Sequence, residues 1–498
     1  MSRGPLFLAL ALAALLLAPT ASAEFGPESE DGYPISVDGL ALRPPVEGQL
    51  ILHPTGVVPA AAPLNKVGPL TIYPYYPLLT AEVQRLANDH PGLVKLTSAG
   101  KSGLGLDMWL LEIADFENPD MIPLDQREVL YIDGGTHSNE YSGVYFVTEI
   151  AQFLLDEYET NETAKWIVQN RHVFILPMVN PDGSNAFGRL NAQTVNINRN
   201  FPATWGTVEE QPILNNPGPE PGSEPETQIV MALMDKLQPD YVNSIHCCGN
   251  LWLHPWGAEE IPAAPDLQMF TRICDEAFYD VREDCGPIWS TIYPASGTTA
   301  DEGYGRLGAS SWTYEMSGRA NKVGVWGEPV SELDVREQER ESWRGIMHAF
   351  LNVEKYGAYP KILAIEGDAN RLSVLVENIG YGNFTIGNLT LGGKTVPIPP
   401  LGPNEQTTLT VEGPFTAGNL TVQVDWVKRH WLSPSEVRTL NLPLVEEAGR
   451  LKAILPDVPV TPLANPGESV DENTIPTPAL GLLAAALVGV ALLARRRA

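Results

Sequence analysis

The chain has 498 residues, which is enough for more than one domain and a sizeable core. Its formal net charge is −29 at neutral pH, and this disfavours a nucleic-acid partner because DNA and RNA are themselves polyanions. An acidic balance of this size fits a soluble exported protein and by itself says nothing about the substrate.

Residues 1–23 have the pattern of a secretory signal peptide. A short basic start is followed by an apolar run and by small residues at Ala21 and Ala23, which predicts cleavage after Ala23. An uncleaved membrane anchor is the alternative, and the shortness of the apolar run argues against it. Residues 24–71 are rich in Pro and Gly and are expected to form an N-terminal arm or a short propeptide.

Strand-like and helix-like stretches alternate over residues 72–356. The apolar residues of 141–158 recur at helical spacing, whereas 129–133 and 172–179 are short apolar runs typical of buried strands. Helices are predicted at 79–89, 141–158, 226–237 and 333–355, and strands near 93–98, 108–114, 129–133, 172–179, 241–245 and 310–316. Such alternation predicts an α/β domain with a mixed, mostly parallel central sheet flanked by helices.

The pattern changes after residue 357. Residues 358–447 contain short strands separated by turn residues, which predicts a β-sandwich domain. Residues 448–478 are Pro-rich and acidic and are expected to form a stalk. Residues 479–498 contain an apolar run closed by three arginines. This run is expected to be a single C-terminal transmembrane helix, or a sorting tail that is removed, with the body of the protein outside the cell.

The four cysteines are Cys247, Cys248, Cys274 and Cys285. An exported protein meets conditions that permit disulfides. A short-loop bridge between Cys274 and Cys285 is expected, although four cysteines allow three pairings and the sequence does not choose among them.

Two metal-competent side chains stand where a predicted strand gives way to a predicted helix. In "DGGTHSNEYSG" (133–143), His137 and Glu140 follow the predicted strand 129–133 and precede the predicted helix at 141–158. Open α/β sheets bind ligands at the carboxyl ends of their strands, and an imidazole with a carboxylate suits Zn²⁺. Taken alone, the pair is more simply explained as a helix-capping glutamate and a surface histidine. A catalytic zinc takes three protein ligands, so a metal site here needs a third.

His246 and His254 are the candidates for the third ligand. His246 directly follows the predicted strand 241–245, as His137 follows its own strand, whereas His254 follows the short run 251–253. The strand-end position favours His246, and the pattern alone leaves His254 open.

Three further charged residues occupy positions that suggest chemistry. Arg189 and Arg199 lie between the expected ligands, where two arginines beside a metal would suit an anionic substrate group or a developing oxyanion. Glu315 lies in the apolar strand 310–316, where a carboxylate is costly unless it has a partner or a function. Solvated arginines and a structural ion pair are the alternatives.

Together these blocks resemble the zinc metallocarboxypeptidases of the carboxypeptidase A type, over roughly residues 72–356. The resemblance rests on "THSNE", "NPDG…R…NRNF", "SIHCCGNLWLHPWG", "IYPASG" and "WTYEM", in that order. It implies one Zn²⁺ per chain. The implied roles are metal ligation by His137, Glu140 and His246, general base and acid catalysis by Glu315, a place beside the scissile carbonyl for Arg189, binding of the substrate's terminal carboxylate by Asn198, Arg199 and Tyr293, and the floor of the terminal side-chain pocket at Ala300.

The resemblance also bears on specificity. The pocket region is uncharged at Thr298, Thr299 and Ala300, which favours a neutral or apolar terminal residue, while Asp301 and Glu302 leave a basic preference open. In a separate departure, an asparagine at position 196 stands where the family usually has aspartate, which implies a change next to the metal ligands.

The function implied is that of an exported zinc-dependent carboxypeptidase, which cuts the last peptide bond of peptides with a free C-terminal carboxylate. It would reside at the cell surface, anchored by the C-terminal helix or released. A related zinc amidohydrolase acting on cell-wall peptides or acylated amino acids is the main alternative. A non-catalytic surface binding protein is a further alternative.

Overall fold

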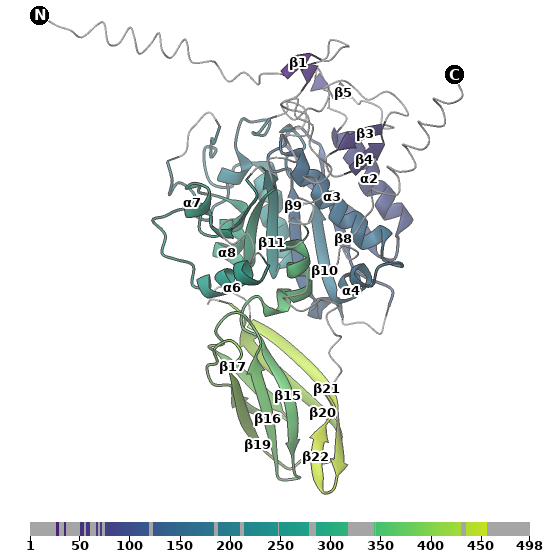
Figure 1. The fold of residues 1–498 in the computed structure, drawn as a ribbon, viewed down its shortest axis with the longest axis vertical. Helices are drawn as coiled ribbons and strands as arrows, with labels where there is room; N and C mark the ends of the chain where they lie inside the picture. Colours follow the sequence, from purple (N-terminus) through teal and green to yellow (C-terminus); the bar gives the residue numbers. More distant parts are fainter. Residues whose placement is uncertain are drawn as a thin grey trace, which may run out of the picture.

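The computed structural model describes residues 26–28, 34–35, 50–53, 56–59, 66–67, 70–71, 75–118, 123–183, 188–209, 214–247, 249–277, 285–316, 343, 345–429 and 435–455. These residues form an α/β domain and a smaller all-β domain that lies at one end of it (Figure 1). Three short hairpins precede the first domain: β1 (Gly26–Glu28) with β2 (Pro34–Ile35), β3 (Leu50–His53) with β4 (Gly56–Pro59), and β5 (Lys66–Val67) with β6 (Leu70–Thr71).

An eight-stranded mixed sheet forms the centre of the first domain. In spatial order its strands are β13 (Cys285–Pro287), β12 (Leu251–His254), β14 (Ser310–Met316), β11 (Tyr241–Cys247), β9 (Glu128–Gly134), β10 (Arg171–Leu176), β8 (Asp107–Ile113) and β7 (Val94–Lys101). The central strands β14, β11, β9 and β10 are parallel. Antiparallel pairs join β12 to β14, β8 to β10 and β7 to β8. The predicted mixed sheet is confirmed.

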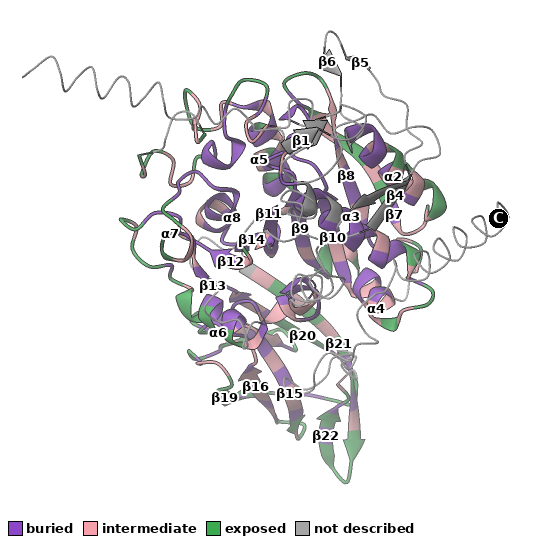
Figure 2. Ribbon diagram, turned by 45° about the horizontal axis from the view of Figure 1, so that its top comes forward, coloured by how far each residue is buried: buried purple, intermediate pink, exposed green. Residues whose placement is uncertain are grey.

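Helices cover both faces of this sheet (Figures 1 and 2). Helices α2 (Tyr75–Asp89), α3 (Tyr141–Asp156) and α4 (Glu162–Asn170) share one apolar core with the sheet, and α5 (Pro225–Leu237) belongs to a core on the other face. Helices α6 (Leu267–Ala277), α7 (Ile288–Thr291) and α8 (Thr299–Leu307) lie near the β12–β14 end of the sheet.

Alternation along the strands assigns side chains to the two cores. On β9, Leu130 and Ile132 join the core that contains α3, whereas Tyr131 joins the core that contains α5. A strand covered on both faces is apolar throughout, because every residue is buried on one side or the other. This explains why 129–133 appears as a continuous apolar run in the sequence.

The helices predicted at 79–89, 141–158 and 226–237 are present with shifted ends, and each predicted strand is present. Helices α4, α6, α7 and α8 were not predicted from the sequence. Strands β12 and β13 were not predicted either. The helix predicted at 333–355 lies partly outside the described residues, and within them residues 345–352 are helical.

The second domain is one antiparallel sheet rather than the predicted sandwich of two. Its order is β18 (Lys394–Pro397), β17 (Gly387–Leu391), β20 (Gly418–Val427), β21 (Ser435–Glu447), β22 (Arg450–Ala453), β15 (Pro360–Gly367), β16 (Arg371–Asn378) and β19 (Gln406–Glu412). The edge strands β18 and β19 contact each other, so the sheet is nearly closed around a core of its own. The strands alternate as expected, but alternation cannot distinguish two facing sheets from one that curls. Strand β22 lies past residue 447, where we expected the domain to end, because the chain turns back to pair with β21 and β15.

The signal peptide, most of the N-terminal arm, most of the stalk and the apolar tail at 479–498 lie outside the described residues. Within the described part of the chain, no helix has the length and apolar character needed to cross a membrane. Cys274 and Cys285 form the predicted disulfide, and Cys247 is also disulfide-bonded.

Candidate metal centre

The predicted metal ligands meet at the carboxyl ends of two neighbouring parallel strands. His137 lies just beyond the end of β9, and Glu140 directly precedes α3. His246 is near the end of β11, which pairs with β9 in parallel. Parallel strands end on the same edge of a sheet, so side chains distant in sequence converge there.

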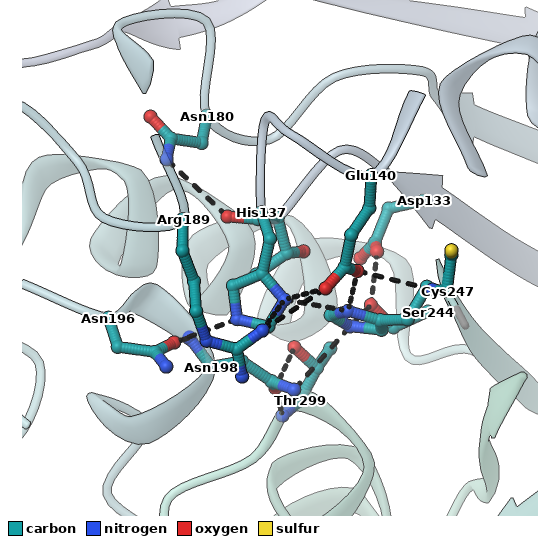
Figure 3. Close-up of polar contacts among 12 residues, drawn as sticks. Asp133, His137, Glu140, Asn180, Arg189, Asn196, Asn198, Ser244, Cys247 and Thr299 are labelled. Carbon is teal, nitrogen blue, oxygen red and sulfur yellow. Dashed lines mark hydrogen bonds and ion pairs between the residues drawn. The ribbon is translucent and has the colours of Figure 1, made fainter. Parts of the chain in front are cut away.

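His137, Glu140 and His246 form a buried group whose ligand atoms lie within 4.8 Å of one another (Figure 3). Glu140 Oε1 is 2.8 Å from His137 Nδ1, and Glu140 Oε2 is 2.9 Å from His246 Nδ1. The two Nδ1 atoms are 3.2 Å apart. Two imidazole nitrogens and a carboxylate are the ligand set of many catalytic zinc sites, which keep a further position for water or substrate.

The far ring nitrogen of His137 supports its role as a ligand. Its Nε2 is 3.0 Å from Asn196 Oδ1, and the Asn196 amide nitrogen donates to Asn215 Oδ1 at 3.1 Å. This orientation of the amide makes Nε2 the donor and leaves Nδ1 with its lone pair. Burial, together with Arg189, lowers the pKa of His137 to about 3, so the ring is neutral at pH 7 as metal binding requires.

Glu315 lies on β14, in parallel register with His246. Burial raises its pKa to about 7, and the Glu140 carboxylate acts in the same direction, whereas His246, Arg189 and Arg199 oppose the shift. A carboxyl group with a pKa near neutrality can both take and give a proton. A bound cation would lower this pKa.

The predicted arginines and their neighbours surround the same group. Arg189 Nη1 lies 3.1 Å from Glu140 Oε1 and 3.1 Å from His137 Nδ1. Arg199 is buried, and its guanidinium lies 5.9 Å from the ring centre of the half-exposed Tyr293. Asn198 Nδ2 is 3.4 Å from His246 Nε2, while its Oδ1 accepts from the Thr299 backbone N–H at 2.9 Å.

Ala300 lies in a small apolar cluster. Its buried members are Leu253, Ile288, Ala295 and Ala300, with Leu251 and Ile292 packed against them. Both acidic neighbours of Ala300 are engaged elsewhere. Asp301 accepts from the Gly257 N–H at 3.0 Å and the Thr204 hydroxyl at 2.7 Å, and Glu302 accepts from the Ala203 N–H at 2.9 Å and pairs with Arg306.

His254, the rival ligand, lies away from this group. Its ring stacks on Phe270 with 4.6 Å between ring centres, and its Nδ1 is 2.8 Å from Pro255 O. Burial lowers its pKa to about 4. His254 is a packed core residue, as expected for a neutral histidine among aromatic rings.

Sequence reasoning missed two polar residues of the site, Asp133 and Ser244. Both are fully buried, and Ser244 Oγ donates to Asp133 Oδ1 at 2.7 Å. A signal for Asp133 was present, because it ends an apolar strand and a carboxylate in that setting is costly without a role. Ser244 stands two residues before His246 and therefore on the same face of β11.

Fold and site together define a class, proteins with an α/β fold whose metal-competent side chains converge at the strand ends of a mixed sheet. The model of the zinc carboxypeptidase family matches residues 79–340, more than half of the chain. The chain belongs to this family.

Two curated relatives carry related names. Carboxypeptidase SOL1 of Arabidopsis thaliana is 26% identical over 301 residues, which cover 58% of this chain and 57% of that protein. Carboxypeptidase B of Astacus astacus is 26% identical over 306 residues, covering 55% of this chain and 95% of that protein. The chain therefore spans nearly all of the crayfish relative but little more than half of the plant relative.

Among solved structures, carboxypeptidase A of Helicoverpa armigera is similar, with 24% identity and a TM-score of 0.45. The match covers 54% of this chain and 71% of that one.

Proposed function

We propose that this chain is a zinc-dependent carboxypeptidase that hydrolyses the last peptide bond of peptides with a free C-terminal carboxylate. The observation that carries the proposal is the buried group of His137, Glu140 and His246, with Glu315 in register beside it. Family membership supports the reaction class.

Zinc held by the three ligands supplies Lewis acidity, which makes a water molecule nucleophilic near neutral pH and polarises the scissile carbonyl. Glu315 takes the proton of the attacking water and later passes it to the leaving amine, so the carboxyl group ends the cycle as it began. Arg189 stabilises the negative charge that develops on the carbonyl oxygen. Its contact with Glu140 supports this role, because the guanidinium already reaches the metal ligands.

Arg199, Asn198 and Tyr293 hold the terminal carboxylate of the substrate. A guanidinium binds a carboxylate through two parallel hydrogen bonds, and the burial of Arg199 strengthens that attraction. Tyr293 is half exposed, so its ring and hydroxyl are accessible to a bound peptide. A clamp on the free carboxylate confines cutting to the chain end.

The preferred terminal residue is apolar or neutral. The cluster around Ala300 is apolar, and the carboxylates of Asp301 and Glu302 are satisfied by groups on other segments. A basic side chain entering this pocket would lose its hydration without gaining an ionic partner.

We also propose that the protein is exported, as the signal-like N-terminus predicts. The Cys274–Cys285 disulfide supports this location, because such bonds persist in oxidising compartments. Surface anchoring by the C-terminal segment stays a sequence-based prediction.

A zinc amidohydrolase acting on cell-wall peptides or acylated amino acids is the second candidate, since the same metal group would serve any amide bond. The two candidates differ in whether a free peptide carboxylate is required. The test is to incubate the purified chain with a series of peptides bearing free or amidated C-termini, with and without a chelator, and to identify the products by mass.

We expect release of single apolar C-terminal residues from the free peptides, loss of activity with the chelator and recovery on adding Zn²⁺. Equal cleavage of amidated peptides would contradict the carboxylate clamp. Cleavage of a murein peptide or an acylated amino acid alone, with ordinary peptides left intact, would favour the amidohydrolase.

A further inference from the structure

Ser244 contacts Nε2 of His246, whereas the other ring nitrogen, Nδ1, faces Glu140, and Asp133 contacts Ser244 in turn. Ser244 and His246 share a face of β11 because they are two residues apart. Asp133 stands opposite Ser244 on the neighbouring strand β9. All three side chains are completely buried, so no solvent competes for their hydrogen bonds.

The direction of these hydrogen bonds follows from what each group can donate. An ionised carboxylate only accepts, so the Ser244 hydroxyl donates its proton to Asp133 Oδ1 at 2.7 Å. Ser244 Oγ also lies 3.1 Å from His246 Nε2, and there it can only accept. His246 therefore carries its proton on Nε2, and its Nδ1 presents a lone pair toward Glu140 and His137.

A second neighbour of the ring, the Asn198 amide, would favour a lone pair on Nε2, but its contact is longer than that of Ser244 Oγ, which decides the assignment. Asn198 Nδ2 lies 3.4 Å from His246 Nε2, but it is an amide donor and cannot accept the ring proton. The Asn198 amide is held in this orientation because its oxygen accepts from the Thr299 N–H. Among the described contacts of Nε2, only the serine hydroxyl can take its proton.

The two histidines reach the same tautomer by different means. His137 is held by the neutral amide of Asn196, whereas His246 is held by a hydroxyl that is itself bound to a carboxylate. Burying the Asp133 carboxylate costs free energy, and a purely structural role for this residue would offset that cost poorly. Negative charge behind an imidazole raises its basicity and strengthens its bond to a metal.

We propose that Asp133 and Ser244 act as a relay that positions His246 for metal binding, fixing its tautomer and adding negative charge behind the ring. The inference rests on the proposed function only through the metal-binding role of His137, Glu140 and His246. Asp133 and Ser244 are positioning residues, because they act through His246 and touch neither metal nor substrate.

The test is the affinity of the full chain for Zn²⁺, measured at pH 7.5 by competition with a chromophoric chelator, for wild type, D133N and S244A. We expect each variant to bind zinc about 10–100-fold more weakly, as is usual when a hydrogen-bond partner of a metal ligand is lost. S244A should lose more than D133N, because asparagine keeps an oxygen for the serine hydroxyl. The absorption spectrum of the cobalt-loaded protein should change in both variants.

S311A is the matched control. Ser311 is a buried serine on the adjacent strand β14, and its hydroxyl has no hydrogen-bond partner among the described residues. The same substitution there should leave zinc affinity within about twofold of wild type, inside the usual effect of a neutral change. Circular dichroism of the metal-free proteins sets a temperature at which all four chains are folded, and affinities are compared there.

Affinities of D133N and S244A within twofold of wild type would overturn the relay. An equal loss in S311A would also overturn it, since the effect would then come from the packing of the sheet. Failure of the wild-type chain to bind zinc would instead contradict the proposed function. This outcome can be told apart from failure of the relay because it is measured on the wild type alone.

Discussion

The carboxylate of Glu315 is surrounded by groups that set its protonation. Burial, with a smaller contribution from Glu140, raises the pKa of Glu315 to about 7, while His246 and the nearby arginines oppose the shift. We predict that E315Q retains zinc but loses at least about 10²-fold in turnover, because glutamine cannot take the proton of the attacking water. Steady-state hydrolysis of an apolar-ended peptide, with metal content measured in parallel, checks this.

E112Q serves as the comparison at the same scale. Glu112 lies on β8, two strands from β9 in the sheet, and pairs with His172 at 2.9 Å outside the metal-competent group. The turnover of the E112Q variant should stay close to that of the wild type. Near-normal turnover in E315Q would reject Glu315 as the base, whatever E112Q does.

The start of helix α3 packs directly on strand β11. A methyl group at Gly143 would lie 2.7 Å from the backbone oxygen of Ile245, closer than atoms can approach. Glu140 and His246 flank this contact in the sequence, so the close approach of the two elements sets the distance between two of the candidate metal ligands. Only glycine allows this close approach, because it has no Cβ atom.

We predict that G143A destabilises the chain by about 1–3 kcal/mol, as overpacking usually does. Zinc binding should weaken about tenfold or more, because the added methyl group would push the start of helix α3 away from β11, and Glu140 would move away from His246 with it. Thermal melting and chelator competition measure the two effects. G402A is the control, since the added methyl there would approach only the flexible Glu405 side chain, at 3.3 Å. Unchanged zinc affinity in G143A would show that the ligand distance does not depend on this contact.

The two domains are joined by partly buried ion pairs at the amino ends of strands β9 and β11, where the all-β domain lies against the α/β domain (Figure 1). Asp240, just before β11, accepts from Lys428 at 2.7 Å and lies 3.6 Å from Arg429. Glu128, the first residue of β9, pairs with Arg438 of the second domain and with Arg171 at 2.9 Å. These contacts bind the all-β domain to the amino ends of the central strands.

This junction predicts a dependence of stability on pH. Burial alone would raise the pKa of Asp240, but Lys428 and Arg429 prevail and lower it to about 2. A lowered pKa means that the stabilisation is complete above the unfolded value of about 3.9 and is lost as the pH falls toward 2, an effect of about 2–3 kcal/mol.

The measurement is the thermal melting of wild type and D240N between pH 7 and pH 3. We expect D240N to be less stable at pH 7, because Lys428 stays buried without its carboxylate. The difference between the two proteins should shrink below about pH 4. D89N, at a solvent-exposed pair with Arg85, should cost under about 1 kcal/mol. A difference between wild type and D240N that stays constant with pH would contradict the role of this ion pair.

Much of this molecule could be predicted from local pattern. Apolar periodicity located six of the eight strands of the central sheet and three of its helices, and the carboxyl ends of β9 and β11 pointed to His137, Glu140 and His246. These features depend on neighbours a few residues apart, which is the range over which periodicity acts. The short elements α7, β12 and β13 were missed because three or four residues carry no period.

Contacts between distant segments decided the rest. The pairing of β11 with β9 and β14 brings His246 to the other ligands and leaves His254 among aromatic rings. The partners of Asp301, Asp133 and Ser244, and the closure of the second sheet, also come from segments far away in sequence. A residue's own neighbours determine which element it joins, but the packing of whole elements determines which side chains finally meet.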